Sequence, residues 1–141
     1  QEEVKGKAGE KVVKPETSEK LRYLFALNTE PGKGGSGTRA AVPGYNVGGK
    51  TGTAEIPAPY GYEPFAAGNS IASFLAFLPA DDPVVSILIK LDRPWGYWGS
   101  MTAAPLAEEL LERLVVLMEI PPDDLRYQLI AQGGSPFARE Y

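Results

Sequence analysis

The sequence predicts a mixed α/β domain of the α+β type, in which a helix, an antiparallel meander of three strands and a second helix follow one another. Three observations support this prediction. An amphipathic segment begins at a proline, strand-like segments are separated by turn residues, and leucines recur at helical spacing near the end. With 141 residues, 43% of them hydrophobic and 23% charged, the chain can bury the core of one domain.

The first helix is expected over residues 15–27, because Pro15 suits the first helical position, where its missing N–H is not needed. Apolar side chains recur in this segment with the period of a helix, at Leu21, Leu24, Phe25 and Leu27. A glycine-rich loop, residues 28–38, follows this helix. Ahead of the helix, the weakly alternating stretch QEEVKGKAGEKVV predicts a loop or the end of a β-hairpin.

Strands are expected over residues 45–56, 69–80 and 83–92, and the last two of these are rich in β-branched and aromatic residues. The short Pro-Ala-Asp-Asp turn between those two implies an antiparallel pair. The third strand is almost continuously apolar, as a central strand buried on both faces would be. Residues 57–68 contain three Pro and two Gly and therefore predict a loop.

A second helix should follow the aromatic turn RPWGYWGS, with Ser100 or Thr102 as its cap and Pro105 in its first turn. Four leucines form one apolar face of this helix, namely Leu106, Leu110, Leu114 and Leu117. The aromatic side chains of the turn are expected to pack beneath the helix, with a partner-binding surface as the alternative. These side chains are Trp95, Tyr97 and Trp98.

Two consecutive prolines, Pro121 and Pro122, should end the second helix, and we place a boundary there. Residues 1–122 are expected to form one unit. Residues 123–141 are expected to form a C-terminal tail with one short helix.

Composition excludes several classes of function. The formal net charge is −4 and Lys and Arg do not cluster, so no nucleic-acid partner is expected. The chain has no Cys and no His, and we therefore expect no metal site and no cofactor; catalysis would have to use Lys, carboxylates, hydroxyls or backbone amides. The apolar runs are too short to span a bilayer, so any membrane anchor would lie outside these residues.

The stretch GYNVGGKTGTAE, residues 44–55, fits two unrelated signatures. It contains G-x-x-x-x-G-K-[ST], the phosphate-binding P-loop of nucleotide-binding proteins, and also K-T-G, a motif of serine acyl-transfer enzymes. A P-loop needs a helix that begins at the Lys-Thr pair, whereas Gly52, Pro57 and Pro59 disfavour a helix here. The nucleotide-binding interpretation is therefore kept only as a distant alternative.

As an edge strand, the same residues suit acyl transfer from a peptide that ends in a free carboxylate. Lys50 supplies positive charge, and the hydroxyls of Thr51 and Thr53 can bind a carboxylate. The Thr53 amide can face a developing oxyanion, and Gly52 leaves room for another backbone to approach. Strict alternation places Lys50 and Thr53 on opposite faces of the strand, so we expect a twist or bulge near Gly52.

Most of the chain resembles class B penicillin-binding proteins of the cell-division (septal) type. The segments are KPETSEKLRYLF (14–25), GSGTRAAVPGYNVGGKTGTAE (35–55), SFLAFLPADDPVVSILIKLDRP (73–94) and YWGSMTAAPLAEELLERL (97–114). The resemblance implies the penicillin-binding-protein/serine β-lactamase-like transpeptidase fold, an antiparallel sheet flanked by helices. It identifies residues 1–122 as the C-terminal part of such a domain.

The resemblance also implies roles for the residues of the K-T-G strand. Lys50 would order the Ser of an S-x-N motif, and the Thr53 amide would form half of an oxyanion hole; these are the expected catalytic groups. Thr51, Gly52 and Thr53 would bind the substrate, a peptidoglycan stem peptide ending in D-Ala-D-Ala or a β-lactam antibiotic.

Two motifs of that family are absent, because no S-x-x-K and no S-x-N occurs in the chain. We therefore expect the nucleophile to lie in a missing N-terminal part of the transpeptidase domain, and this chain alone to be inactive. The resemblance implies that the parent protein is a peptidoglycan D,D-transpeptidase that acts through a serine acyl-enzyme. It would be anchored at the extracytoplasmic face of the bacterial membrane and work with division proteins.

Two alternatives stay open. The parent could be a penicillin-binding sensor that is acylated without turnover, since a sensor would use the same cleft. The chain could also be a scaffold without a site of its own.

Overall fold

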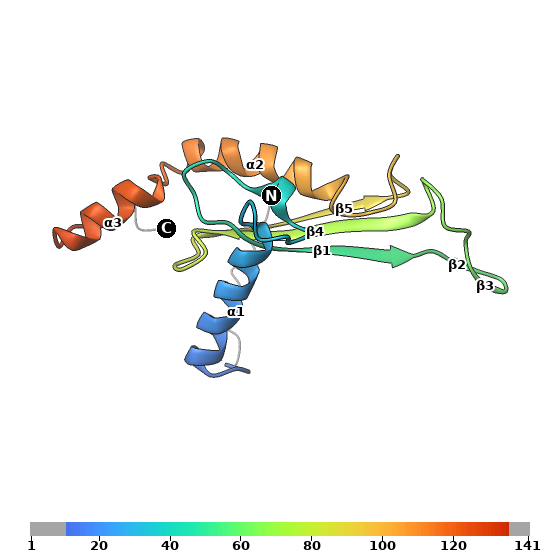
Figure 1. The fold of residues 1–141 in the computed structure, drawn as a ribbon, viewed down its shortest axis with the longest axis horizontal. Helices are drawn as coiled ribbons and strands as arrows, with labels where there is room; N and C mark the ends of the chain where they lie inside the picture. The colour runs from blue at the N-terminus through green and yellow to red at the C-terminus, as the bar shows by residue number, and fades with distance from the viewer. Residues whose placement is uncertain (1–10, 136–141) are drawn as a thin grey trace, which may run out of the picture.

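The computed structural model describes residues 11–135, which form an antiparallel sheet with helices around it (Figure 1). The main elements are α1 (Pro15–Thr29), β1 (Gly48–Glu55), β4 (Ser70–Leu78), β5 (Val85–Asp92), α2 (Ala103–Leu117) and α3 (Asp123–Ala131). Shorter elements are the 3₁₀ turn η1 (Thr38–Ala40) and the strands β2 (Pro57–Ala58) and β3 (Gly61–Tyr62). The predicted order of helix, three strands and helix is confirmed. The stretch expected as a loop or hairpin end lies mostly outside the described residues.

The main sheet has the strand order β1-β4-β5, and both strand pairs are antiparallel, as predicted. Central position and burial on both faces were expected for residues 83–92, and this expectation is wrong within the described part of the chain. There β5 is an edge strand whose side chains alternate between half-buried and exposed, and Leu88 is 65% exposed. The central strand is instead β4, because it pairs on both sides.

Helix α2 lies along one face of the sheet (Figure 1) and its small side chains form the core with β4. The expected leucine face is wrong, because Leu106, Leu110 and Leu117 are exposed. The side chains of α2 that are buried are Ala103, Ala104, Ala107, Leu111 and Val115. These positions also follow helical spacing, and alanines allow the helix axis to approach the sheet closely. Choosing the larger apolar residues as the buried ones therefore predicted the wrong face of α2.

The ends of α2 follow the prediction more closely. Thr102 is the N-cap residue, although its hydroxyl donates to the carbonyl oxygen of Trp98 over 3.0 Å and not to an amide of the helix. Pro105 lies in the first turn, as expected. The helix already ends at Leu117, ahead of the two prolines.

Helix α1 begins at Pro15, as predicted, and continues to Thr29, two residues beyond the expected end. Its expected apolar face is only partly used, because Leu21 and Leu24 are exposed. Phe25 makes an edge-on contact with Phe77 of β4, with ring centroids 6.1 Å apart. Helix α1 therefore contacts the sheet mainly through its C-terminal half.

Two further segments differ in detail from the sequence prediction. Residues 57–68, predicted to be a loop, include the short β2–β3 hairpin. The short helix expected in the tail is present as α3. The Asp123 amide of α3 donates to the Gly44 carbonyl oxygen over 2.9 Å, so the helix is fixed to the segment that leads into β1. The domain boundary at residue 122 stays a prediction.

None of the helices within residues 11–135 combines the length and the apolar character that a bilayer crossing requires.

Candidate active site along strand β1

Strand β1 contains Lys50, Thr51, Gly52 and Thr53, the residues that the sequence predicts as a site. Among the described residues β1 is an edge strand, as predicted. Lys50 and Thr51 lie in the middle of this strand and no helix begins at them, so the helix N-terminus that a P-loop requires is missing at this place. The nucleotide-binding alternative is therefore wrong.

The pairing of β1 with β4 decides which face each side chain takes. Thr51 lies opposite Phe74, and Thr53 lies opposite Ala72. Both partners are fully buried, and Phe74 belongs to the core beneath α2. Because directly opposed residues share a face of the sheet, the two threonine side chains lie on the α2 face.

Lys50 starts on the opposite face, and of the twist or bulge expected near Gly52 the bulge is absent. Residues from Gly48 to Glu55 pair one to one with β4. The Lys50 side chain instead folds back along the strand, so that Nζ donates to the Thr51 carbonyl oxygen over 2.9 Å and to Thr51 Oγ1 over 3.4 Å. The length of the lysine side chain, and not a distorted backbone, brings the ammonium group to the hydroxyl.

Two side chains at the end of α1 occupy the first half of the edge. The Thr29 hydroxyl donates to the Val47 carbonyl oxygen, and Asn28 Nδ2 donates to the Gly49 carbonyl oxygen over 2.8 Å. Backbone groups of alternate residues point to the same side of a strand, so Thr51 also presents its backbone groups at this edge. An additional strand can therefore pair with β1 only beyond Gly49.

The second half of the edge carries Thr53, whose amide points outward by the same alternation. Its hydroxyl accepts a hydrogen bond of 3.2 Å from the Gly99 amide in the turn before α2. A Cβ on Gly99 would lie 2.5 Å from the carbonyl oxygens of Gly52 and Ser73, so only glycine fits. A Cβ on Gly52 itself would lie 2.4 Å from the Ser73 hydroxyl, on the other face of the sheet, and the close approach of another backbone expected at Gly52 stays a prediction.

Aromatic side chains line the sheet end beside Thr53, and their expected position beneath α2 is wrong for two of the three. Tyr97 is buried, but Trp95 and Trp98 are exposed. Tyr97 and Trp98 contact Phe65, with centroids 4.2 Å and 5.6 Å from it. Burial raises the pKa of Tyr97, and the charge of Glu55 raises it further. A cavity of about 430 Å³ is lined by Thr53, Ala54, Glu55, Tyr62, Phe65, Tyr97 and Trp98.

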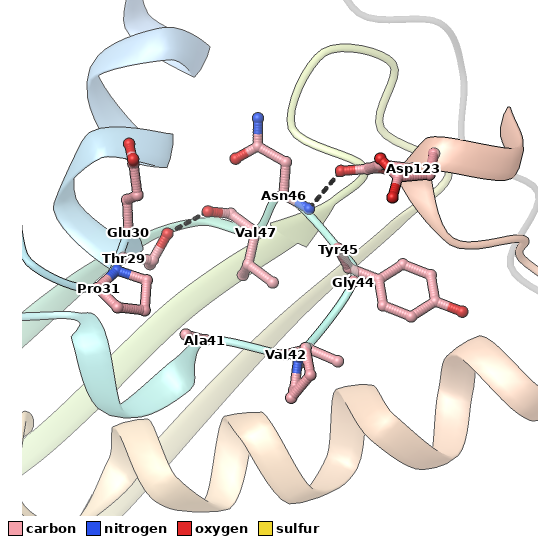
Figure 2. A pocket seen from close by; sticks show the side chains of 12 residues that line it. Thr29, Glu30, Pro31, Ala41, Val42, Gly44, Tyr45, Asn46, Val47 and Asp123 are labelled. Carbon is pink, nitrogen blue, oxygen red and sulfur yellow. Dashed lines mark hydrogen bonds between the residues drawn. The ribbon is translucent and has the colours of Figure 1, made fainter. Parts of the chain in front are cut away.

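A larger cavity of about 780 Å³ lies at the other end of β1, between the end of α1, residues 41–47 and the start of α3 (Figure 2). One of its acidic side chains serves the fold. Asp123 accepts a 2.6 Å hydrogen bond from the Asn46 amide, drawn in Figure 2, and pairs with Arg126. The described lining contains no Lys and no Ser. The cation and paired hydroxyls therefore lie at the β1 edge, outside this cavity.

Sequence reasoning missed two residues near the motif. The Ser36 hydroxyl, in the glycine-rich loop, lies 2.8 Å from the Thr51 hydroxyl. Asn28 holds both this loop and the β1 edge through its side chain. The available signal was a single serine between glycines ahead of the K-T-G motif, but nothing local indicated that the loop folds back onto β1.

At this edge an ammonium group, hydroxyls on one face and an outward amide come together. This arrangement suits an extended chain with a negative carboxylate, bound through main-chain bonds and charged hydrogen bonds. The described residues contain no group of three or more acidic side chains that could hold a metal ion.

Comparison with known proteins points to one family. Residues 2–112 match the family model "Penicillin binding protein transpeptidase domain". The chain is 34% identical over 116 residues to "Probable peptidoglycan D,D-transpeptidase PenA" of Neisseria meningitidis, covering 81% of this chain and 19% of that protein. It is 35% identical over 143 residues to "Probable peptidoglycan D,D-transpeptidase FtsI" of Caulobacter vibrioides, covering 91% and 23%.

A sporulation protein and a solved structure extend the comparison. The chain is 36% identical over 117 residues to "Stage V sporulation protein D" of Bacillus subtilis, covering 82% of this chain and 17% of that protein. The transpeptidase domain of Burkholderia pseudomallei penicillin-binding protein 3 superposes with a TM-score of 0.72 at 29% identity, covering 82% of this chain and 34% of that one. The chain thus spans about a fifth of the length of its curated relatives.

The family match covers more than half of the chain, and the relatives exceed 30% identity over most of it. With a Lys-Thr-Gly sequence on an edge strand of the fold that these proteins share, the chain belongs to the family of penicillin-binding-protein transpeptidase domains.

Proposed function

We propose that this chain is the C-terminal part of the domain of a peptidoglycan D,D-transpeptidase that crosslinks stem peptides through a serine acyl-enzyme. The observation that carries the proposal is the open edge of β1 beyond Gly49. There the Lys50 ammonium, the Thr51 and Thr53 hydroxyls and an outward amide lie together. Two relatives that are named as probable peptidoglycan D,D-transpeptidases support the same activity.

In this proposal the edge binds the end of a D-Ala-D-Ala stem peptide. Thr51 and Thr53 donate hydrogen bonds to the terminal carboxylate, and Lys50 contributes charge and orders the Ser of an S-x-N motif. Gly52, without a side chain, leaves room for the substrate on the face of the strand from which Lys50 starts. The Thr53 amide stabilises the oxyanion that forms when a serine attacks the carbonyl of the penultimate D-Ala.

In the serine step, one bond forms, one bond breaks and one proton moves. A bond forms between serine Oγ and the carbonyl carbon, the peptide bond to the terminal D-Ala breaks, and the serine proton passes to the leaving amine. The acyl group is then transferred to an amine of a neighbouring stem peptide, which crosslinks the two stem peptides. A β-lactam would acylate the same serine through its strained amide.

The serine itself is proposed to lie in another part of the parent protein. The sequence has no S-x-x-K and no S-x-N, and the chain spans about a fifth of its curated relatives. We therefore propose that this chain is inactive alone and completes its site with the N-terminal part of the transpeptidase domain. Membrane anchoring at the extracytoplasmic face, a septal role and contacts with division proteins belong to the same proposal.

Labelling with a fluorescent penicillin tests the proposal. The full-length protein should become covalently labelled, and the 141-residue chain alone should not. Lys50→Ala should lower the acylation rate constant of the full-length protein by about a hundredfold, the scale for losing a preorganised polar group. Lys90→Ala is the matched control, because Lys90 is an exposed lysine on β5. A full-length protein that stays unlabelled would refute the proposal.

A second measurement separates a transpeptidase from a penicillin-binding sensor, the alternative that shares this cleft. Incubation with a stem pentapeptide and an acceptor amine should release D-Ala and form a crosslinked product. Penicillin labelling without any D-Ala release would favour the sensor.

A further inference from the structure

The hydroxyl of Ser36 lies against the carboxylate-binding position of the proposed site. Ser36 Oγ is 2.8 Å from Thr51 Oγ1, a normal distance for a hydrogen bond between hydroxyls. Ser36 is exposed in the glycine-rich loop, and fifteen positions separate it from Thr51 in the sequence. The contact is therefore made by the fold and not by local chain geometry.

Asn28 fixes the loop in this position, and its amide can be oriented in only one way. Asn28 Nδ2 donates to the Gly49 carbonyl oxygen over 2.8 Å, and a carbonyl can only accept. Asn28 Oδ1 accepts from the Ser36 backbone amide over 3.1 Å, and an N–H can only donate. One side chain of α1 thereby joins the edge of β1 to the residue that contacts Thr51.

The glycines on both sides of Ser36 allow the loop to wrap around Asn28. A Cβ on Gly35 would lie 2.0 Å from the Asn28 carbonyl oxygen, and one on Gly37 would lie 2.8 Å from Asn28 Nδ2. The Gly37 amide also donates to the Asn28 carbonyl oxygen over 3.1 Å. The Ser36 backbone is thus held on both sides, and its hydroxyl is presented at a defined place.

The protons of the two hydroxyls decide what this contact does. A serine hydroxyl has one proton, which Ser36 can donate to Thr51 Oγ1 or to Asn28 Oδ1, 3.3 Å away. When Thr51 donates its own proton to a carboxylate, its oxygen is free to accept from Ser36. Donation from Ser36 to Thr51 therefore favours the orientation in which Thr51 donates to an anion.

We propose that Ser36 is a positioning residue for substrate recognition, which directs the Thr51 hydroxyl proton toward the terminal carboxylate of the stem peptide or of a β-lactam. This inference rests on the proposed function of the β1 edge. Ser36 acts through Thr51, and Asn28 sets its position. Lys50 Nζ donates to the same Thr51 oxygen over 3.4 Å, so it supplies charge and favours the same orientation of the Thr51 proton.

The test compares a ligand that has the carboxylate with one that lacks it. The second-order acylation rate constant of the full-length protein is measured with benzylpenicillin and with its methyl ester. Ser36→Ala should lower the constant for benzylpenicillin by about 3- to 10-fold, the effect of one lost hydroxyl hydrogen bond. The constant for the ester should not change. Ser36→Thr keeps a hydroxyl and should therefore retain the wild-type ratio of the benzylpenicillin constant to the ester constant. Ser86→Ala on β5 is the matched control.

A double-mutant cycle tests the route through Thr51. In a Thr51→Val background, Ser36→Ala should have no further effect on either ligand, because the hydroxyl that it orients is gone. An equal loss for both ligands, or a full loss in the Thr51→Val background, would overturn the inference. Wild-type protein that benzylpenicillin does not acylate would refute the proposed function itself. Normal acylation with no effect of Ser36→Ala would refute only the role of Ser36.

Discussion

Replacement of Arg126 by methionine should weaken the attachment of α3 to the rest of the fold. The Arg126 side chain is 1% exposed and pairs with two carboxylates. Its guanidinium donates to Asp81, in the turn between β4 and β5, over 2.5 and 3.0 Å, and to Asp123, at the start of α3, over 3.1 and 3.3 Å. Arg126→Met keeps most of the side-chain volume but leaves both carboxylates without their cation.

The size of the effect follows from the exposure of each partner. Removing one member of a buried ion pair costs about 3–5 kcal/mol when the remaining charge stays buried. The Asp81 side chain is 42% exposed and can regain water, whereas the Asp123 side chain is only 14% exposed. Screening of the Asp81 pair lowers the expected loss of unfolding free energy to about 2–4 kcal/mol at neutral pH.

The loss should depend on pH because of Asp81. Burial would raise the pKa of Asp81, but the hydrogen bonds and the charge of Arg126 outweigh burial and hold the pKa below its ordinary value of 3.8. A carboxyl group with a lowered pKa in the folded state stabilises the fold above its unfolded-state pKa, and this stabilisation is lost as the pH falls through the folded-state pKa. The difference between wild type and Arg126→Met should therefore shrink below about pH 4.

Urea unfolding of the transpeptidase domain that contains this chain, at pH 7 and at pH 3, measures both effects. Arg113→Met is the matched control, because the Arg113–Glu109 pair on α2 has side chains that are 75% and 57% exposed. That control should change the unfolding free energy by less than about 0.5 kcal/mol. An Arg126→Met loss below about 1 kcal/mol, or a loss of the same size at both pH values, would refute the reasoning.

Two other substitutions test the packing of the site and of the core. Gly99→Ala places a Cβ 2.5 Å from the Gly52 carbonyl oxygen, so it should lower the unfolding free energy by about 1–3 kcal/mol. It should also slow penicillin acylation, because the turn moves away from Thr53. An unchanged melting temperature and an unchanged acylation rate would contradict this. Leu111→Ala should lower the unfolding free energy by about 2–5 kcal/mol, because Leu111 is fully buried. Leu117→Ala, at a side chain that is 78% exposed, should lower it by less than about 0.5 kcal/mol. Calorimetry would show the opposite order if the predicted leucine face were the core.

Much of the fold could be predicted because its signals are local. Pro15 marks the start of α1, and the Pro-Ala-Asp-Asp turn marks the reversal between β4 and β5. The helix faces could not be predicted in the same way, because two sets of positions in α2 satisfy helical spacing. The choice between leucines and alanines depends on how closely the helix approaches the sheet, which is a property of the assembled core.

In the candidate site, too, the features with a local sequence signal were predicted and those that depend on the assembled fold were not. The K-T-G strand and its edge position were predicted from residue types that suit one chemistry. The position of the Lys50 ammonium group was not predicted. A distortion of the backbone near Gly52 was expected to bring it to the threonines, whereas the Lys50 side chain itself folds back toward Thr51. Ser36 and Asn28 were missed because their partners on β1 lie 15 and 21 residues away in the sequence, beyond any local pattern.

The support of β1 differs between its two halves, and this difference suits a substrate-binding edge. An edge strand is paired on one side only and would otherwise be open to unwanted pairing along its whole length. At and just before its start, Asn28 and Thr29 of α1 bond the outward carbonyl oxygens of Gly49 and Val47, and Asp123 of α3 holds the segment ahead of the strand. Beyond Gly49 the same edge presents Lys50 and the threonines. Fixing one half of the strand with side chains therefore restricts strand pairing to the half that carries the proposed chemistry.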